Sequence, residues 1–259
     1  VAASGGYAMA YDALGVMHFN AWGVPRNDRK ALRWWRKAAD LGIAKSQTSI
    51  GNMYAIGRGA PRDYKAAAKW WRMAAAKGVL SAQTNLGRIH LQGHGTAQDH
   101  AQAAKWFRMA ADKGSADGQT NLGILYEKGL GVTQDYGKAI ALYRAAADKG
   151  YAPAQAQLGS LYYNGRGVQQ NYDKALFWLR PAAKAGLAQA QVYLAILYRD
   201  GHAVKRDRAY AYMWFRAAAA KGHGYAIDQM ARIERRMTRF EMERAKKLAV
   251  EYIEKTGRR

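Results

Sequence analysis

The chain has 259 residues, with 41 lysines and arginines against 19 aspartates and glutamates, and therefore a formal charge of +22. No apolar run approaches the roughly 20 residues that a membrane-spanning helix needs, so we do not expect an integral membrane protein. The absence of cysteine excludes disulfides and cysteine-based zinc sites, and the charge favours anionic partners.

From Tyr7 onward, the same residue types return every 36 residues, without insertion or deletion up to Gly222. Glycine and arginine keep this spacing in all six units, and glutamine keeps it in five. Such a period predicts a repeat architecture, with units at 7–42, 43–78, 79–114, 115–150, 151–186 and 187–222. The repeated positions are Gly42, Gly78, Gly114, Gly150, Gly186 and Gly222; Arg36, Arg72, Arg108, Arg144, Arg180 and Arg216; and Gln47, Gln83, Gln119, Gln155 and Gln191.

Each unit is predicted to hold two helices. In the second unit, the first helix spans about 44–56, with apolar residues at the spacing of one helical face and a glycine, Gly51, that permits a close helix crossing. A Gly-x-Gly turn ends it. The second helix then begins at a column of Asn and Asp residues that can cap helices, namely Asn27, Asp63, Asp99, Asp135, Asn171 and Asp207.

The last segment, 223–259, departs from the repeat. It starts like another first helix, but Thr238-Arg239-Phe240-Glu241 then has the form of a capping box that opens a final helix. We interpret this segment as a C-terminal cap, because the end of a repeat array needs a polar outer face. The whole pattern predicts an all-α, right-handed α/α superhelical solenoid that forms a single domain over 1–259.

The fourth unit carries a family pattern nearly throughout, in Leu122-Gly123, Tyr126, Gly129, Gly131-Val132, Asp135-Tyr136, Lys138-Ala139, Ala146-Ala147 and Gly150. In these motifs the chain resembles the Sel-one-like repeat family, a subclass of tetratricopeptide-type repeats. The resemblance covers 7–222 and implies an adaptor that binds other proteins. Many such proteins are bacterial and act in the envelope or in host interaction, which implies a periplasmic or secreted protein. The first residue is valine, so we expect a trimmed or processed chain whose signal peptide is absent here.

The resemblance also implies that the first helices line a concave groove, where residues that vary between units could encode a partner. These variable positions are rich in amides and hydroxyls, which suit a peptide backbone or a glycan. Asn52, Asn85 and Arg88 resemble part of a carboxylate clamp, although the lysine of that clamp is not evident. A solvated groove without a dedicated ligand stays open as an alternative. The candidate groove residues are Asn52, Thr84, Asn85, Arg88, Thr120, Asn121, Gln157, Tyr163, Asn164 and Tyr193.

Other candidate sites favour structural roles. We expect His90 to pack or hydrogen-bond rather than to bind a metal with His94 and His100, and we expect no cofactor. Trp22 is the one tryptophan that we expect at the surface. The repeated arginines either form an anion-binding ladder or pack as scaffolding, and we favour the second role. Most of the remaining tryptophans recur every 36 residues on the second helices, and this column is predicted to fill the core: Trp34, Trp70, Trp106, Leu142, Trp178 and Trp214.

No nucleophile, base and oxyanion set emerges, and no phosphate-binding loop is present, so we expect no enzyme. Nucleic acid is disfavoured as a partner because no recognised binding module accompanies the charge. The sequence therefore predicts a non-catalytic scaffold that binds a peptide or partner protein in its groove. The alternative is an acidic polysaccharide or cell-wall polymer bound through a basic surface, and such binding should weaken steeply with ionic strength.

Overall fold

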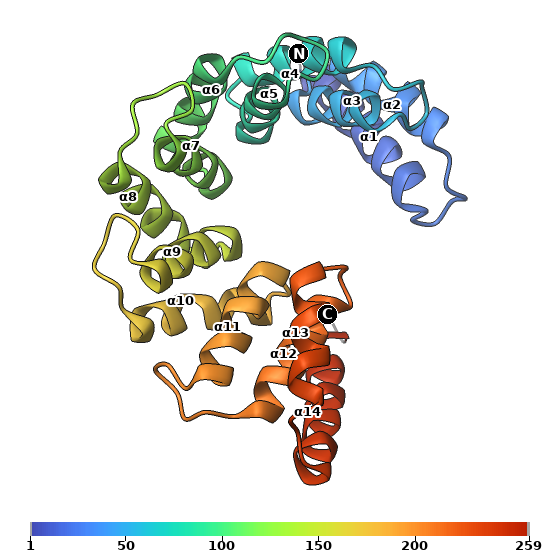
Figure 1. Cartoon of the computed structure of the whole chain (residues 1–259). Helices are drawn as coiled ribbons and strands as arrows, with labels where there is room; N and C mark the ends of the chain where they lie inside the picture. Colours follow the sequence, from blue (N-terminus) through green and yellow to red (C-terminus); the bar gives the residue numbers. More distant parts are fainter. Residues whose placement is uncertain (1, 258–259) are drawn as a thin grey trace. The chain divides into compact units, whose positions relative to one another are not determined.

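The structure, a computed structural model, describes residues 2–257, and this part of the chain forms fourteen helices and no strands (Figure 1). Short links join the helices. The odd-numbered helices are the first helices of the 36-residue repeats, and the even-numbered helices are the second. Their bounds are α1 Ala2–Asn20, α2 Asp28–Asp40, α3 Ala44–Ile56, α4 Tyr64–Ala76, α5 Leu80–Gln92, α6 His100–Asp112, α7 Ala116–Lys128, α8 Tyr136–Ala147, α9 Ala152–Asn164, α10 Tyr172–Lys184, α11 Ala188–Asp200, α12 Arg208–Ala219, α13 Gly224–Glu234 and α14 Arg239–Gly257.

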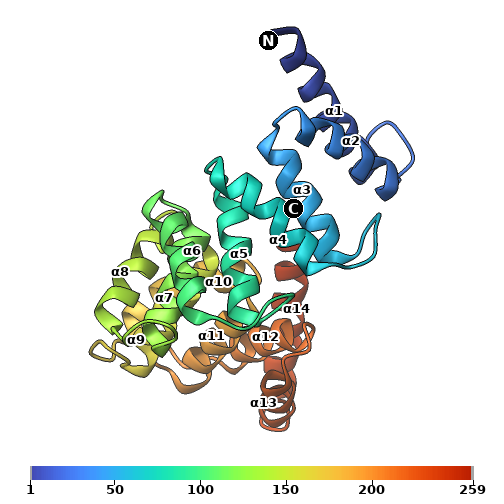
Figure 2. The ribbon, with the colours of Figure 1, turned by 90° about the horizontal axis from the view of Figure 1, so that it is seen from above.

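The chain divides into two compact units, residues 1–134 with α1–α7 and residues 135–259 with α8–α14. In the first unit, α1 pairs with α2, α3 with α4 and α5 with α6, and each pair packs against the next helix along the chain (Figure 2). The second unit repeats this pattern with α9 against α10 and α11 against α12. The fold is therefore an all-α repeat fold, as predicted.

A buried side chain on each second helix fills the space between the paired helices. Within the first unit this side chain lies directly on a glycine of the first helix, and a Cβ added at Gly15, Gly51 or Gly87 would come within 2.5 Å of the ring. The glycine thus makes room for an aromatic ring of the paired helix. The buried column is Trp35, Trp71, Phe107, Tyr143, Leu179 and Phe215.

This column stands one residue after the one that we predicted to fill the core. Trp34, Trp70, Trp106 and Leu142 are only half-buried, so the prediction is wrong for them, whereas Trp178 and Trp214 are buried. Consecutive residues of a helix point about 100° apart, so two neighbouring side chains do not face the same partner helix. Trp34, for example, stacks on Tyr11 at a centroid distance of 5.6 Å, with Lys37 over its ring.

The helix ends follow from side chains that occupy fixed positions of the repeat. Each residue of the Asn/Asp column accepts a hydrogen bond from the backbone N–H three residues later, as Asp63 does from Ala66 at 2.9 Å. Gly57 ends α3 in the left-handed conformation, with φ of 71°. Three of the buried glutamines, Gln83, Gln155 and Gln191, donate to carbonyls at the end of the preceding second helix, as Gln191 does to Ala183 at 3.1 Å.

The turn between the two helices of a 36-residue repeat contacts the preceding repeat. Gly59 lies so close to α2 that a Cβ would come within 2.5 Å of the Asp28 carbonyl oxygen. Arg58, between the two glycines, holds the Asp28 carboxylate with a contact of 2.6 Å. His202 stacks in the corresponding place on Tyr172, with ring centroids 4.3 Å apart. Each such turn therefore covers the start of a second helix.

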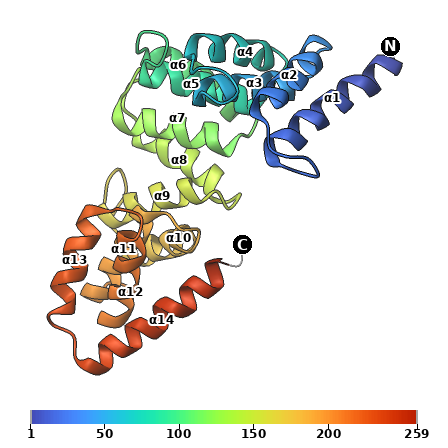
Figure 3. The same ribbon diagram turned by 90° about the vertical axis from the view of Figure 1, so that its right-hand side faces the viewer.

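The final helix begins with the predicted capping box. Thr238 Oγ1 accepts from the Glu241 N–H at 3.2 Å, and Glu241 accepts from the Thr238 N–H at 2.8 Å. This helix packs against α12 (Figure 3). Ala245 and Ala249 are buried, and the rings of Trp214 and Tyr252 meet at 5.0 Å.

Candidate functional site

In the first compact unit, residues 1–134, polar side chains of successive first helices form a continuous series of hydrogen bonds. Asn85 on α5 donates to Asn52 Oδ1 on α3 at 3.0 Å, and Arg88 donates to Asn85 at 3.1 Å. Arg88 also grips both carboxylate oxygens of Asp117 on α7, at 2.7 and 2.6 Å. Asn121 completes the series by donating to Asp117 Oδ1 at 2.9 Å. We call Asn52, Asn85, Arg88, Asp117 and Asn121 the polar ladder.

The polar ladder is anchored to the core at one end. Trp71, the buried ring of α4, donates its indole N–H to Asn52 Oδ1 at 3.1 Å. Asn52 therefore has its oxygen fixed by two donors while its side chain remains exposed. The structure thus brings together four of the predicted groove residues, Asn52, Asn85, Arg88 and Asn121, and it adds Asp117 and Trp71, which the sequence analysis missed.

Arg88 differs from its predicted role. We expected its charge to meet an anion on a ligand, but the guanidinium is already occupied by Asp117 and Asn85. Nη2 contacts both carboxylate oxygens and Nη1 donates to Asn85 Oδ1, so both terminal nitrogens of the guanidinium already have acceptors. Arg88 instead fixes α5 against α7 and holds the amides of the ladder in position.

Two predicted groove residues do not reach the surface. Thr84 and Thr120 are only 2% and 4% exposed, and each hydroxyl donates to a carbonyl of its own helix, at 3.1 and 2.7 Å. The prediction that they line a groove is wrong, because each side chain points toward the neighbouring helices.

The second compact unit, residues 135–259, carries a different cluster of polar and aromatic side chains on its first helices. Asn164 donates to the Tyr193 hydroxyl at 3.2 Å, and Ser160 donates to the same oxygen at 3.1 Å. The Tyr163 ring packs against Tyr193 at 4.9 Å, and burial raises the pKa of the Tyr163 phenol. Gln157 is half-buried on α9. The predicted residues Tyr163, Asn164 and Tyr193 are therefore neighbours, whereas Gln157 forms no hydrogen bond with them.

Two of the repeated arginines make contacts of the scaffold kind that we favoured. Arg36 donates to the Tyr54 hydroxyl at 2.5 Å and Arg108 to that of Tyr126 at 3.0 Å, so each bond ties a second helix to the next first helix. Among the described residues, no group of three or more His, Asp or Glu side chains is arranged to hold a metal ion. Trp22 is 62% exposed, which confirms the prediction. No helix in residues 2–257 is both long and apolar enough to cross a membrane.

Comparison with known families supports these repeats directly. Six consecutive stretches match the Sel1 repeat: 8–43, 44–79, 80–115, 116–151, 152–187 and 188–223. The chain belongs to the Sel1 repeat family. The matched stretches begin one residue after the units counted from Tyr7 and cover well over half of the sequence. No curated protein matches the chain.

Solved Sel1 repeat structures show the same fold. A Sel1 repeat protein from Oxalobacter formigenes is 33% identical with a TM-score of 0.78, over 83% of this chain and 88% of that one. The protective antigen c5321 of uropathogenic Escherichia coli is 25% identical with a TM-score of 0.50, over 98% and 78%. An immunity protein from Pseudomonas aeruginosa, PA5087, shares the fold at 21% identity and a TM-score of 0.57, over 82% and 81%.

Sel1 repeat proteins generally serve as scaffolds for protein–protein interaction and are generally non-catalytic. The positions that vary between repeats are those that can distinguish one member from another, and in this chain they include the polar ladder. The residues missed by the sequence analysis had a partial signal. Asp117 is the one acidic residue near the start of a first helix, but its pairing with Arg88 depends on how far α5 and α7 are displaced along each other.

Proposed function

We propose that this Sel1 repeat protein is a non-catalytic scaffold that holds an extended segment of another protein against its first helices. The polar ladder is the observation that carries the proposal. Its side chains lie at surface positions that vary between the 36-residue repeats, whereas the buried column of the second helices keeps a large, mostly aromatic residue in every repeat. Uniform positions maintain the packing of the helices, and variable surface positions are therefore available for recognition.

The ladder keeps unused hydrogen-bonding groups at both ends. Among the described residues, the Asn52 Nδ2 group has no acceptor and the Asn121 Oδ1 atom has no donor. A peptide backbone offers one donor and one acceptor per residue, so it can meet both groups.

The ladder is also held in place before any partner arrives. Trp71 and Asp117 fix Asn52 and Asn121, and Arg88 fixes Asn85 between them. Side chains that are already ordered lose less entropy on binding, so more of the contact energy contributes to affinity. In the second unit, the cluster of Tyr163, Asn164 and Tyr193 supplies aromatic surface of the kind that is enriched at protein interfaces.

The first test maps where a captured partner lies. A photo-crosslinking phenylalanine derivative is placed at Ser49 on α3, in the same repeat position as Asn85, or at the exposed Lys69 on α4. The protein is then used to capture partners from cells. We expect cross-links to a partner from Ser49 and far fewer from Lys69. Cross-links mainly from Lys69 would contradict the proposal.

The second test measures affinity for the captured partner. Asn85→Ala, Arg88→Ala and Asn121→Ala together should weaken binding at least about tenfold, or about 1.4 kcal/mol, with little change in melting temperature. The matched control removes three exposed side chains that share one position on the second helices, Arg33, Lys69 and Lys105. If the control abolishes binding and the ladder variant does not, a basic surface on the second helices binds the partner. A steep loss with ionic strength would then accompany it.

A further inference from the structure

The link between α13 and α14 is shorter than the links in the preceding units. Seven residues connect α11 to α12, whereas four connect α13 to α14. In the preceding repeats, the turn between the two helices lies over the start of the second helix of the repeat before it. Arg58 lies over Asp28 in this way, and His202 over Tyr172. The short link after α13 lacks the Gly-x-Gly turn, and a pocket of about 390 Å³ opens beside the start of α12.

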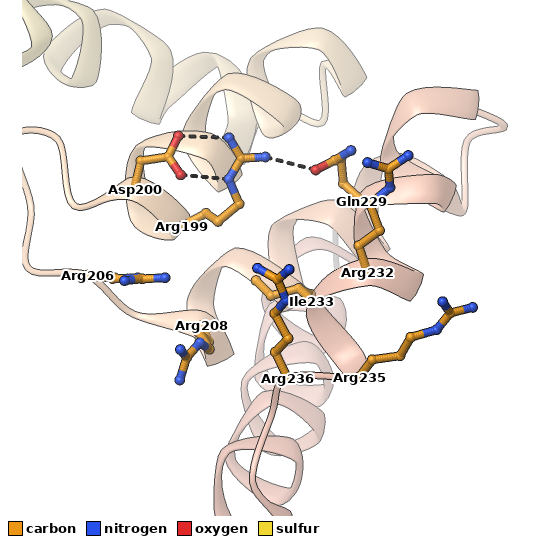
Figure 4. Close-up of a pocket in the computed structure, with 9 residues that line it drawn as sticks. All are labelled: Arg199, Asp200, Arg206, Arg208, Gln229, Arg232, Ile233, Arg235 and Arg236. Carbon is orange, nitrogen blue, oxygen red and sulfur yellow. Dashed lines mark hydrogen bonds and ion pairs between the residues drawn. The ribbon is translucent and has the colours of Figure 1, made fainter.

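Arginines dominate the walls of this pocket (Figure 4). They come from the end of α11, from the turn before α12 and the first residue of α12, and from α13 and the link after it. Asp200 is the one carboxylate in the wall. We call this site the arginine pocket, and its six arginines are Arg199, Arg206, Arg208, Arg232, Arg235 and Arg236.

Half of these arginines already have acidic partners. Arg199 makes two contacts of 2.7 Å with Asp200, and this hydrogen bonding lowers the pKa of the Asp200 carboxyl. Arg208 contacts Glu241 at 3.4 Å and Arg232 contacts Asp228 at 3.1 Å. The carboxylate next to the pocket, Asp207, is occupied by Arg244 at 2.8 Å.

The other three arginines have no ion pair with any described residue. Arg206 and Arg236 point into the space beneath the Arg199–Asp200 pair, and Arg235 lies at the rim (Figure 4). Like charges gathered in one pocket repel one another, and a bound anion relieves that repulsion. Arginine offers two parallel N–H donors to one oxyanion, which suits a carboxylate better than the single ammonium of lysine does.

We propose that the arginine pocket binds the carboxylates of an acidic segment in the partner protein. This inference rests on the proposed function and names the chemistry of the partner. Gln229 and Arg232, which border the pocket on α13, occupy the same repeat positions as Asn85 and Arg88 of the ladder. Within the second unit they continue the series of first-helix positions that includes Tyr193. An extended segment along these positions therefore ends at the arginine pocket.

The test is fluorescence anisotropy with a labelled peptide that contains a run of glutamates, and with a second peptide in which glutamines replace them. We expect the full chain to bind only the glutamate peptide. Arg206→Gln with Arg236→Gln should weaken binding at least about tenfold. The control, Lys246→Gln with Lys247→Gln, removes the same charge from exposed positions of α14 and should change affinity less than about twofold.

Three outcomes would overturn the inference. The first is an equal loss in both double variants, which would assign binding to the general field of the protein. The second is binding of the glutamine peptide with similar affinity. The third is displacement of the peptide by pyrophosphate far more readily than by unlabelled peptide, which would make this a phosphate site. Arg206→Lys with Arg236→Lys keeps the charge, so a partial loss is expected if the arginine geometry matters, and melting curves verify folding.

Failure of this inference is distinguishable from failure of the proposed function. If the glutamate peptide does not bind but binding of the captured partner still requires Asn85, Arg88 and Asn121, only the assignment of the arginine pocket is wrong. If the ladder variant keeps full affinity for the partner while Arg206→Gln with Arg236→Gln loses the peptide, the ladder is not the binding surface and the pocket assignment stands.

Discussion

Phe107 is completely buried against Gly87, whereas the adjacent Trp106 keeps part of its ring in solvent. Phe107→Ala leaves a cavity between α5 and α6 and should cost about 3–5 kcal/mol of unfolding free energy. Trp106→Ala removes a ring that is already partly in solvent, so we expect a smaller cost of about 1–2 kcal/mol. Chemical denaturation of both variants measures the difference. A larger loss for Trp106→Ala would show that the packing roles of the two columns are reversed.

His90 stands where most units have a tyrosine, and its Nδ1 atom is buried without a partner among the described residues. Burial lowers the pKa of His90, and Arg72 lowers it further, while Asp99 raises it. The unfolded chain therefore binds a proton more readily than the folded protein. The resulting contribution to stability is complete above the ordinary histidine pKa of about 6.5 and is lost as pH falls below that value and through the lower pKa of the folded protein.

We therefore expect His90→Tyr to flatten the decrease of melting temperature between about pH 7 and pH 5. The new hydroxyl can also accept from Arg72, as Tyr54 does from Arg36, so stability at neutral pH should rise. His90→Phe separates the two effects, because it removes the titration and adds no hydroxyl. Equal pH dependence in all three proteins would exclude His90 as the responsible group.

At the scale of helices and turns, most boundaries could be predicted from the sequence. A left-handed glycine and a capping box each act on their own segment of backbone, so α3 ends and α14 begins close to the predicted residues. The candidate site was predicted less well. Whether Thr84 is buried and whether Arg88 meets Asp117 depend on the rotation and displacement of one helix against another, and a 36-residue period does not determine these quantities.

Ala203 occupies the second glycine position of its turn and adopts φ of 58°, in the left-handed region. Alanine pays a steric cost there that glycine avoids, so Ala203→Gly should stabilise the protein by about 1 kcal/mol. The control is Ala141→Gly, at an exposed position within α8, which should destabilise by about 1 kcal/mol. Thermal unfolding distinguishes them by sign. A loss in both would mean that the turn does not store strain.

Helix α14 covers part of α12 through small side chains. Ala249 is 5% exposed, whereas the adjacent Val250 is 54% exposed. Ala249→Glu places a charge in the contact with α12 and should detach α14, uncovering apolar surface that promotes self-association. Val250→Glu should change neither the oligomeric state nor the stability. Sedimentation and melting curves measure both effects. A monomeric, stable Ala249→Glu variant would contradict the role of α14 as a cap.

For the molecule as a whole, we propose that the repeats unfold as one cooperative domain, because the 36-residue register is unbroken from Tyr7 to Gly222. Phe107 and Phe215 are equivalent fully buried residues of the first and second compact units. In denaturant, Phe107→Ala and Phe215→Ala should each shift the same single transition, observed by circular dichroism and by tryptophan fluorescence. Two transitions, each shifted by only one substitution, would show that the units unfold independently.

The contacts between neighbouring repeats recur at constant separations along the chain. The array can therefore change in length by one 36-residue repeat at a time. Arg36 and Tyr54 are eighteen residues apart, as are Arg108 and Tyr126. Excision of residues 80–115 would place Arg72 the same distance ahead of Tyr126, and so restore the arginine–tyrosine bond at the junction where His90 now stands. Evolution or design can therefore lengthen or shorten the proposed recognition surface by whole repeats, because an arginine and a tyrosine eighteen residues apart can pair at the new junction.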